Sequence, residues 1–247
     1  MSTPIQINGS PDRWPHWQSL LLLSAGTVLP LSLFAYLAHE VFQESGFFWD
    51  QVILQWYVHH RTPALTQAAK LLEVLGGLGV LPIVVLGVVL LLYRINARIH
   101  GWFLISSMVG ALTLNLIIKV VFHRPRPDEL VSVLRESGFS FPSGHAMTNA
   151  AFAAALILIF WRSGRGRPVT VLAVIWMLLI GLSRNYLGVH YPSDVLAAFS
   201  AGMAWVNGLF LLMGHHWPEL RGAPGTSPVA PTLPLAPIHT TETGGPE

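Results

Sequence analysis

The 247-residue sequence has no cysteine and few charged residues. The lack of cysteine excludes disulfide bonds, thiol catalysis and metal sites built on thiolates. Charged residues form 11% of the chain, well below the roughly 25% of a soluble globular domain, so the composition excludes an ordinary cytosolic enzyme. Hydrophobic residues are abundant instead, at 52%, and the mean hydropathy is +0.54. These values are typical of a membrane protein.

The few basic residues are scattered along the chain, and the formal net charge is only +2. A protein that follows a nucleic-acid backbone needs a stripe or patch of lysine and arginine. The sequence therefore predicts no nucleic-acid partner.

Apolar runs recur through most of the chain and predict the fold. They cover residues 17–42, 68–93, 99–122, 144–162, 168–187 and 194–214. Each run approaches or exceeds the roughly 20 residues that cross a bilayer. A backbone in lipid must satisfy its own hydrogen bonds, which favours helices. We predict an all-α, polytopic membrane domain of six transmembrane helices at 17–214.

The two ends of the chain differ from this domain in composition. Residues 1–16 are polar, and the apolar run that follows them has no clear cleavage site, so we expect that run to be retained as the first span. Residues 215–247 are rich in proline, glycine, serine and threonine, which is typical of a disordered tail.

A short aromatic segment precedes the second predicted span, and three glycines lie within that span. Residues 47–57 mix aromatic and polar side chains over a length too short to cross a membrane. Such a segment fits a helix in the membrane interface and equally an ordinary helix covered by other parts of the protein. Gly76, Gly77 and Gly79 favour close helix packing over a phosphate-binding loop, because no Gly-Lys-Ser/Thr sequence follows them.

Cations near the ends of the predicted spans are candidates for function, because a charge at the bilayer centre costs about 2.5–3.5 kcal/mol even on a lenient scale. Lys119 ends the third span, Arg126 follows it in a proline-flanked loop, and Arg184 ends the fifth span. A single such cation is commonly a snorkelling anchor. Three together, two of them with the planar fork that suits phosphate oxygens, predict an anion-binding site.

The segment Pro142-Ser143-Gly144-His145 opens the fourth span. Serine is favoured just before a helix, where the first backbone N–H groups and the positive end of the helix dipole attract anions. Glycine allows the backbone to approach a ligand closely. We therefore predict that Ser143 and Gly144 help to bind the same anion.

Two histidines and one carboxylate complete this set and permit phosphoryl transfer. His190 is a candidate nucleophile if Asp194, four residues later, accepts a hydrogen bond from one ring nitrogen and fixes the tautomer. His145 is then the candidate proton donor to the leaving oxygen, and later the base that activates water. A His/Asp pair also suits a divalent metal, but three nearby cations favour an anion. We predict neither a metal nor a cofactor.

Successive spans cross the membrane in alternate directions, and this span parity places all of these residues on one side of the membrane. The ends of the third and fifth spans and the starts of the fourth and sixth spans must face the same side. Snorkelling residues would be found on both sides instead. His123, Arg124, Asp128 and Glu129 border the predicted site, but the sequence assigns them no role.

At these positions the sequence resembles the type 2 phosphatidic acid phosphatase superfamily, which includes membrane lipid phosphatases, soluble acid phosphatases and vanadium haloperoxidases. The family pattern has three parts, matched by Lys119-x6-Arg126-Pro127, Pro142-Ser143-Gly144-His145 and Ser183-Arg184-x5-His190-x3-Asp194. The resemblance implies a metal-independent reaction in which His190 is the nucleophile, His145 the general acid and Asp194 the partner of the nucleophile. The phosphoryl-binding residues that it implies are Lys119, Arg126, Ser143, Gly144 and Arg184.

The loop arginines give the orientation. Their distribution favours a cytoplasmic N-terminus only slightly, because several cations near spans three to six lie on the opposite side. If those cations are retained for catalysis or binding, the excess of the other loop arginines on the cytoplasmic side becomes clear. We predict cytoplasmic N- and C-termini and an active site at the outer face, which is also the usual arrangement in integral members of the family. The residues in and before the second motif, 139–145, resemble those of bacterial members more than those of eukaryotic members. We therefore expect a bacterial plasma membrane.

The leading hypothesis is a membrane phosphatase that hydrolyses a lipid phosphate or diphosphate, such as a polyprenyl diphosphate, phosphatidylglycerophosphate or phosphatidate. A phosphotransferase that passes the group to a second lipid would use the same residues and stays open. A haloperoxidase is a weaker hypothesis, because the family's haloperoxidases are soluble. A non-catalytic headgroup-binding or transport protein is disfavoured, because binding alone needs cations but neither a nucleophile nor a proton donor.

Overall fold

The computed structural model describes residues 16–44, 46–128 and 131–225. Regular structure within these residues is entirely helical, which confirms the predicted fold class. Most of the predicted N-terminal segment and of the tail lies outside the described residues. The helices are α1 (His16–Glu44), α2 (Phe48–His59), α3 (Pro63–Gly76), α4 (Leu81–Arg94), α5 (Arg98–Phe122), α6 (Gly144–Phe160), α7 (Gly166–Tyr186), α8 (Pro192–His216) and the short 3₁₀ helix η1 (Pro218–Arg221).

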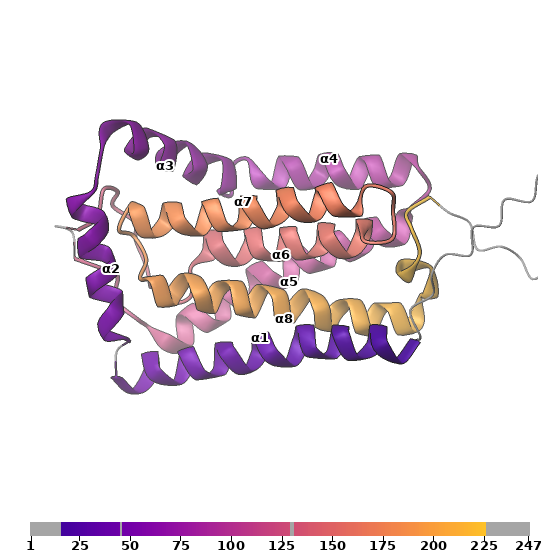
Figure 1. The fold of residues 1–247 in the computed structure, drawn as a ribbon, viewed down its shortest axis with the longest axis horizontal. Coiled ribbons are helices and arrows are strands. Elements are labelled where there is room, and N and C mark those ends of the chain that lie inside the picture. Colours follow the sequence, from indigo (N-terminus) through magenta and orange to yellow (C-terminus); the bar gives the residue numbers. More distant parts are fainter. Residues whose placement is uncertain (1–15, 45, 129–130, 226–247) are drawn as a thin grey trace, which may run out of the picture.

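The long helices form a bundle with α6 at its centre. Helices α1, α5, α6, α7 and α8 run along the long axis of the molecule, and α3 and α4 follow one another along one side (Figure 1). Helix α6 packs against α5, α7 and α8, and α1 packs against α8. Nearly every residue in the first ten positions of α6 is buried, and most of them are alanine or another small residue. Small side chains therefore allow the neighbouring helices to surround α6 closely.

Helices α6 and α8 approach each other most closely near their starts. A Cβ atom on Gly202 of α8 would lie 2.8 Å from the backbone oxygen of Met147 in α6. The Ser143 N–H, just before α6, donates to the Asp194 backbone oxygen in the first turn of α8 at 3.3 Å. This packing holds the starts of the two helices, and the motif residues that they carry, side by side.

By length and composition, the described helices provide fewer membrane spans than the six predicted. Four described helices are long and apolar enough to cross a membrane, in α1, α5, α7 and α8, and the bent pair α3 and α4 makes a fifth candidate. Helix α6 has 17 residues, about 25 Å of helix. Five of the six predicted apolar runs each correspond to one helix, but six transmembrane helices are not confirmed.

The second predicted span is not a continuous helix, which corrects the expectation of one straight span. Helix α3 ends at Gly76, α4 begins at Leu81, and the two helices are bent by 50°. Glycine weakens a helix, and Pro82 in the first turn of α4 has no backbone N–H to continue a helical ladder. A Cβ atom on Gly76 would lie 2.6 Å from Ile180 Cδ1, so this glycine also permits the expected close helix packing.

Helix α2 crosses one end of the bundle (Figure 1) and contacts α7 and α8. Phe48, Val52 and Trp56, spaced four residues apart, are exposed, whereas Asp50 and Leu54 are buried on the other face. An apolar face turned outwards at the end of a membrane bundle is typical of an interface helix. Of the two interpretations drawn from the sequence, the structure favours the interface helix.

The first residues of the predicted tail are ordered. Helix α8 extends to His216, and η1 follows it and packs against α8 and α5. Leu220 in η1 is buried. The burial of this side chain explains why the chain folds back here, against the expectation of disorder from residue 215.

Candidate active site

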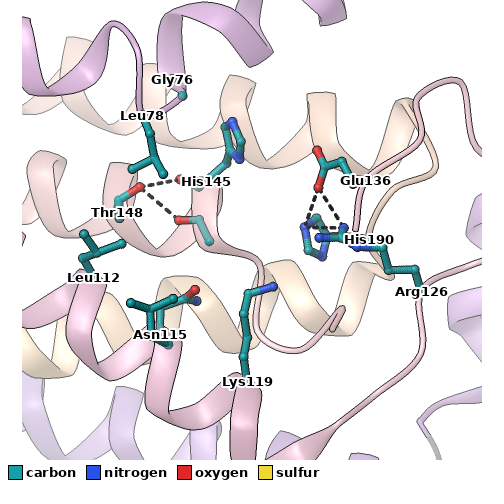
Figure 2. A pocket seen from close by; sticks show the side chains of 13 residues that line it. Gly76, Leu78, Leu112, Asn115, Lys119, Arg126, Glu136, His145, Thr148 and His190 are labelled. Carbon is teal, nitrogen blue, oxygen red and sulfur yellow. Dashed lines mark hydrogen bonds and ion pairs between the residues drawn. The ribbon is translucent and has the colours of Figure 1, made fainter. Parts of the chain in front are cut away.

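The residues singled out in the sequence lie together at the end of the bundle that α2 crosses. Lys119 belongs to the last turn of α5, His145 to the first turn of α6, and His190 to the turn between α7 and α8. With Arg126 and Gly144 they line one cavity of about 200 Å³ (Figure 2). The structure therefore has the one-sided arrangement deduced from span parity.

The contacts of His190 fix its tautomer. Its Nε2 atom lies 3.2 Å from Arg126 Nη1, and a guanidinium group has only donors, so Nε2 is the acceptor and the ring proton is on Nδ1. The Nδ1 atom lies 3.6 Å from Asp194 Oδ2 and 3.4 Å from Ser140 Oγ. Both are oxygen atoms that can accept from Nδ1–H, and Ser140 Oγ is the one within hydrogen-bond distance. The Nε2 lone pair consequently points at Arg126, which lines the cavity together with His190.

His190 is only 1% exposed, and this burial controls its charge. Burial lowers the pKa of His190 to about 4, although the contact with the Asp194 carboxylate and its charge raise it. An imidazole with this pKa is neutral at pH 7, so its Nε2 atom keeps the lone pair that a nucleophile needs.

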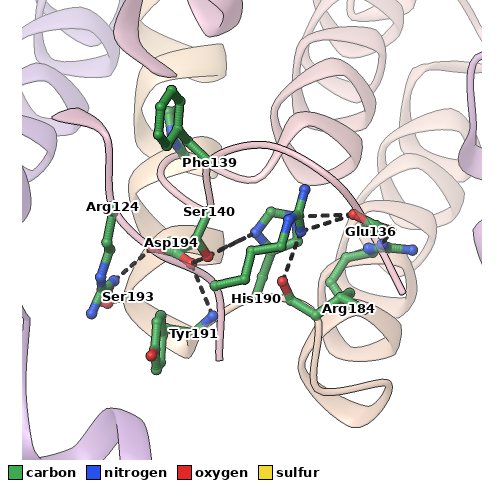
Figure 3. A network of polar contacts seen from close by, with 12 residues as sticks. Arg124, Glu136, Phe139, Ser140, Arg184, His190, Tyr191, Ser193 and Asp194 are labelled. Carbon is green, nitrogen blue, oxygen red and sulfur yellow. Dashed lines mark hydrogen bonds and ion pairs between the residues drawn. The ribbon is translucent and has the colours of Figure 1, made fainter. Parts of the chain in front are cut away.

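The predicted cations Arg126 and Arg184 converge on a carboxylate, Glu136. Figure 2 labels Arg126 and Glu136, and Figure 3 labels Arg184 and Glu136. Arg126 Nη1 lies 2.8 Å from Glu136 Oε2, and Arg184 Nη2 donates to Glu136 Oε1. Arg184 is fully buried, and within the described part of the chain its Nε and Nη1 atoms have no acceptor. Lys119 Nζ donates to the Phe139 backbone oxygen. These contacts place all three cations at the site with donor capacity left on Arg184.

Glu136 is a functional candidate that sequence reasoning missed. It belongs to the loop between α5 and α6, and its Oε2 atom lies 3.9 Å from His190 Nε2. Burial raises the pKa of the Glu136 carboxyl, but the surrounding positive charge, of which Arg184 contributes most, outweighs burial and lowers the pKa overall. The carboxylate is therefore ionised at neutral pH. The sequence indicated only that Glu136 is an acid in the loop between the first two motifs.

The start of α6 presents backbone donors to the cavity. Ser143 is the N-cap residue, as expected, but its side chain makes no capping hydrogen bond. Its Oγ atom is buried and has no partner among the residues that the structure describes. The first N–H groups of any helix lack intrahelical acceptors, and Gly144 at this position lines the cavity without a side chain. Together these groups suit an anion.

The ring of His145 lies against the break between α3 and α4. A Cβ atom on Gly77 would be 3.2 Å from His145 Nε2. The backbone oxygen of His145 accepts a hydrogen bond from Asn149 Nδ2 at 2.8 Å, and the Asn149 amide also donates to the Gly76 backbone oxygen at 2.8 Å. The bent helix pair thus positions the second histidine of the cavity.

In residues 16–44, 46–128 and 131–225, no three histidine or carboxylate side chains are grouped so that they could hold a metal ion.

Comparison with known proteins identifies the family. The model of the PAP2 superfamily matches residues 100–218. Phosphatidylglycerophosphatase B of Bacillus subtilis is 34% identical over 185 residues, which cover 70% of this chain and 89% of that protein. The chain belongs to the PAP2 superfamily. This confirms the resemblance seen in the sequence motifs.

A solved structure and a second curated relative agree with this assignment. The crystal structure of a transmembrane PAP2-type phosphatidylglycerolphosphate phosphatase from Bacillus subtilis superimposes with a TM-score of 0.69 at 27% identity, over 78% of this chain and 96% of that one. An undecaprenyl-diphosphatase of Sulfolobus acidocaldarius is 31% identical over 123 residues, 48% of this chain and 56% of that protein. Membership of the PAP2 superfamily supports hydrolase activity on lipid phosphates by an integral membrane protein.

The neutral state of His190 is directly measurable. With ¹⁵N-labelled histidine, we expect the His190 ring nitrogens to keep the shifts of the neutral Nδ1–H tautomer as the pH falls from about 8 to about 5, because burial lowers its pKa to about 4. The signals are assigned by their absence in His190→Gln, and free histidine in the same buffer gives the reference. Protonation of His190 near pH 6.5, or an Nε2–H tautomer, would contradict this arrangement.

Proposed function

We propose that the protein is an integral membrane phosphatase that hydrolyses a lipid phosphate or diphosphate through a phosphohistidine on His190. The observation that carries this proposal is the orientation of His190, whose Nδ1–H faces Asp194 and whose Nε2 lone pair faces Arg126 and the cavity. The names of the relatives, phosphatidylglycerophosphatase and undecaprenyl-diphosphatase, agree with a phosphate group carried by a lipid.

The first step forms the covalent intermediate. The Nε2 lone pair of His190 attacks phosphorus, and an Nε2–P bond forms while the bond from phosphorus to the leaving oxygen breaks. His145 donates its proton to that oxygen, so the lipid alcohol, or the lipid monophosphate from a diphosphate, leaves with this oxygen protonated. Asp194 stabilises the positive charge that develops on the ring of His190. Arg126 and Arg184 balance the charge on the phosphoryl oxygens.

The second step returns the enzyme to its starting state. His145, now deprotonated, accepts a proton from water, and the resulting hydroxide attacks phosphorus. The Nε2–P bond breaks, its electron pair returns to His190, and inorganic phosphate leaves. No metal takes part in this scheme, and neither a metal nor another cofactor is required for its balance.

The shape of the cavity supports an amphiphilic substrate. Lys119, Arg126 and His190 lie towards one side of the cavity, and Leu78 and Leu112 lie towards the other (Figure 2). Leu78, in the break between α3 and α4, and Leu112, on α5, are also exposed on the outside of the bundle. A lipid would enter sideways between these two elements, with its headgroup on the cations and its chains still in the membrane. Polyprenyl diphosphate, phosphatidylglycerophosphate and phosphatidate all fit this description.

The arrangement of the helix ends supports the proposed topology. Helix α1 begins and α8 ends at the end of the bundle opposite to α2 and the site (Figure 1). Counting α3 with α4 as one crossing and α6 as another gives the six crossings expected from the sequence. With loop arginines such as Arg94 and Arg162 inside, the termini are cytoplasmic and the site faces outwards from the plasma membrane.

Phosphate release tests the proposed activity. Purified protein in lipid vesicles, given a panel of lipid monophosphates and diphosphates, should release inorganic phosphate with EDTA present and without an added lipid acceptor. His190→Gln should lower kcat by at least about 10³-fold, because the nucleophile is removed. His215→Gln, at an exposed histidine on the opposite end of α8, is the matched control and should behave as wild type.

Three outcomes of that assay would contradict the proposal. Full activity in His190→Gln would exclude this histidine as the nucleophile. Loss of activity on removal of divalent metals would exclude the metal-independent scheme. Transfer of the phosphoryl group to an added second lipid, without release of inorganic phosphate, would favour a phosphotransferase instead.

The Glu136 carboxylate and a substrate phosphate require the same arginine donors, those of Arg126 and Arg184. In Glu136→Gln the competing charge is gone, so we expect KM for the lipid phosphate to fall by about fivefold or more. Asp128→Asn, an exposed acid in the same loop, should leave KM unchanged. An unchanged KM with a collapse of kcat in Glu136→Gln would show that Glu136 assists the reaction rather than competes with the substrate.

A further inference from the structure

A buried chain of charged side chains connects the interface helix α2 to the nucleophile. Arg124 lies in the middle of this chain, between Asp50 and Asp194, and Figure 3 shows it beside Asp194. Its Nη2 atom is 2.8 Å from Asp50 Oδ2 on α2, and its Nη1 atom is 2.6 Å from Asp194 Oδ1 on α8. The three side chains are at most 4% exposed. Asp194 is thus held on one oxygen by Arg124, which leaves Oδ2 to face His190 Nδ1.

Asp50 also binds the start of α8 directly. Its Oδ1 atom accepts from the Ser193 backbone N–H at 2.9 Å, and its Oδ2 atom accepts from Ser193 Oγ at 2.5 Å. Arg124 Nη1 contacts the same Ser193 hydroxyl at 2.8 Å. One carboxylate on α2 therefore fixes both the guanidinium group that holds Asp194 and the residue that precedes Asp194 in the chain.

The surroundings leave the guanidinium group little freedom. Gly46, with φ at +125°, precedes α2, and a Cβ atom there would lie 1.9 Å from Arg124 Nη2. Only glycine adopts this conformation readily and leaves the space. On another side the Tyr191 ring lies 4.1 Å from Arg124 Cζ, a cation–π contact. The sequence around Arg124 is therefore built to hold it in one place.

The linked side chains of Asp50, Arg124 and Asp194 also balance one another's buried charge. An unpaired carboxylate at the burial of Asp194 is strongly unfavourable, and the Arg124 guanidinium compensates for it. Arg124 in turn lies between two carboxylates, which keep its two terminal nitrogens in fixed directions. Neither Asp50 nor Arg124 lines the cavity that contains His190. Their influence on the reaction must pass through Asp194.

We propose that Asp50 and Arg124 are positioning residues for the nucleophile. Asp50 fixes the Arg124 guanidinium, Arg124 fixes Asp194, and Asp194 holds His190 with its Nε2 atom towards the phosphoryl group. The proposal rests on the proposed function of His190. It makes α2, which lies outside the three sequence motifs, part of the catalytic arrangement, with Phe48, Val52 and Trp56 facing the membrane interface.

The test is a double-mutant cycle with Asp50→Asn, Arg124→Gln and the two together, each checked by thermal unfolding. Each single variant should lower kcat by about 10- to 100-fold, by analogy with the loss found when a group that orients a metal-binding histidine is removed. KM for the lipid phosphate should stay within about twofold, because Arg126 and Arg184 are untouched. The double variant should lose little more than the worse single variant, since both act through one chain. Gln55→Ala, at an exposed position of α2, is the control and should match wild type.

Inorganic phosphate supplies a second readout that does not depend on turnover. As a competitive ligand it should bind the Asp50→Asn and Arg124→Gln variants as it binds wild type, measured by protection against thermal unfolding. A wild-type kcat in Asp50→Asn, additive losses in the double variant, or a loss of phosphate binding parallel to that of kcat would each overturn the proposal. Full activity of His190→Gln, measured in parallel, would instead show that the proposed function itself has failed.

Discussion

A charge buried in a membrane protein must be neutralised by a neighbouring charge, and the catalytic end of this bundle depends on that constraint. Arg184 is fully buried and is paired with Glu136. Arg124 is buried between Asp50 and Asp194. Each carboxylate therefore has its position set by an arginine, and one of these carboxylates sets the position of His190. The orientation of the candidate nucleophile is a consequence of charge pairing across four segments of the chain.

Helix packing determines which of these charges meet. The small residues of α6 let α8 approach closely, as the contact of Gly202 with the Met147 backbone shows. The starts of the two helices, with His145 and Asp194, are side by side as a result. The break between α3 and α4 contributes in another way, because it brings Gly77 against His145 and leaves Leu78 at the outer edge of the cavity. One packing arrangement thus accounts for both the positions of the candidate site residues and the leucine-lined edge of the cavity.

The sequence predicts a large part of this arrangement, for physical reasons. Hydropathy located the long helices to within a few residues, because apolar length is what a membrane span requires. It did not predict the break in the second span, because the glycines and Pro82 at residues 76–82 lie inside one continuous apolar run. The motif residues were recognisable because phosphoryl chemistry needs cations, a nucleophile and a proton donor together.

Glu136 and Asp50 were missed because their partners are distant in the chain and belong to no motif. Glu136 pairs with Arg184 and Asp50 with Arg124, over 48 and 74 residues. The cost of burying charge offered a signal for Asp50, an acid inside an aromatic and apolar run at the membrane interface. No comparable signal distinguishes Glu136 from the other acids of its loop.

The structure of the protein with bound orthovanadate tests the central claim most directly, because vanadate adopts the five-coordinate geometry of phosphoryl transfer. The account predicts vanadium bonded to His190 Nε2, its oxygens on Arg126 and Arg184, and the Glu136 carboxylate moved away from both arginines. Vanadium bonded to His145 instead, or vanadate bound elsewhere while Glu136 keeps its two arginines, would contradict the assignment of His190 as the nucleophile of this site.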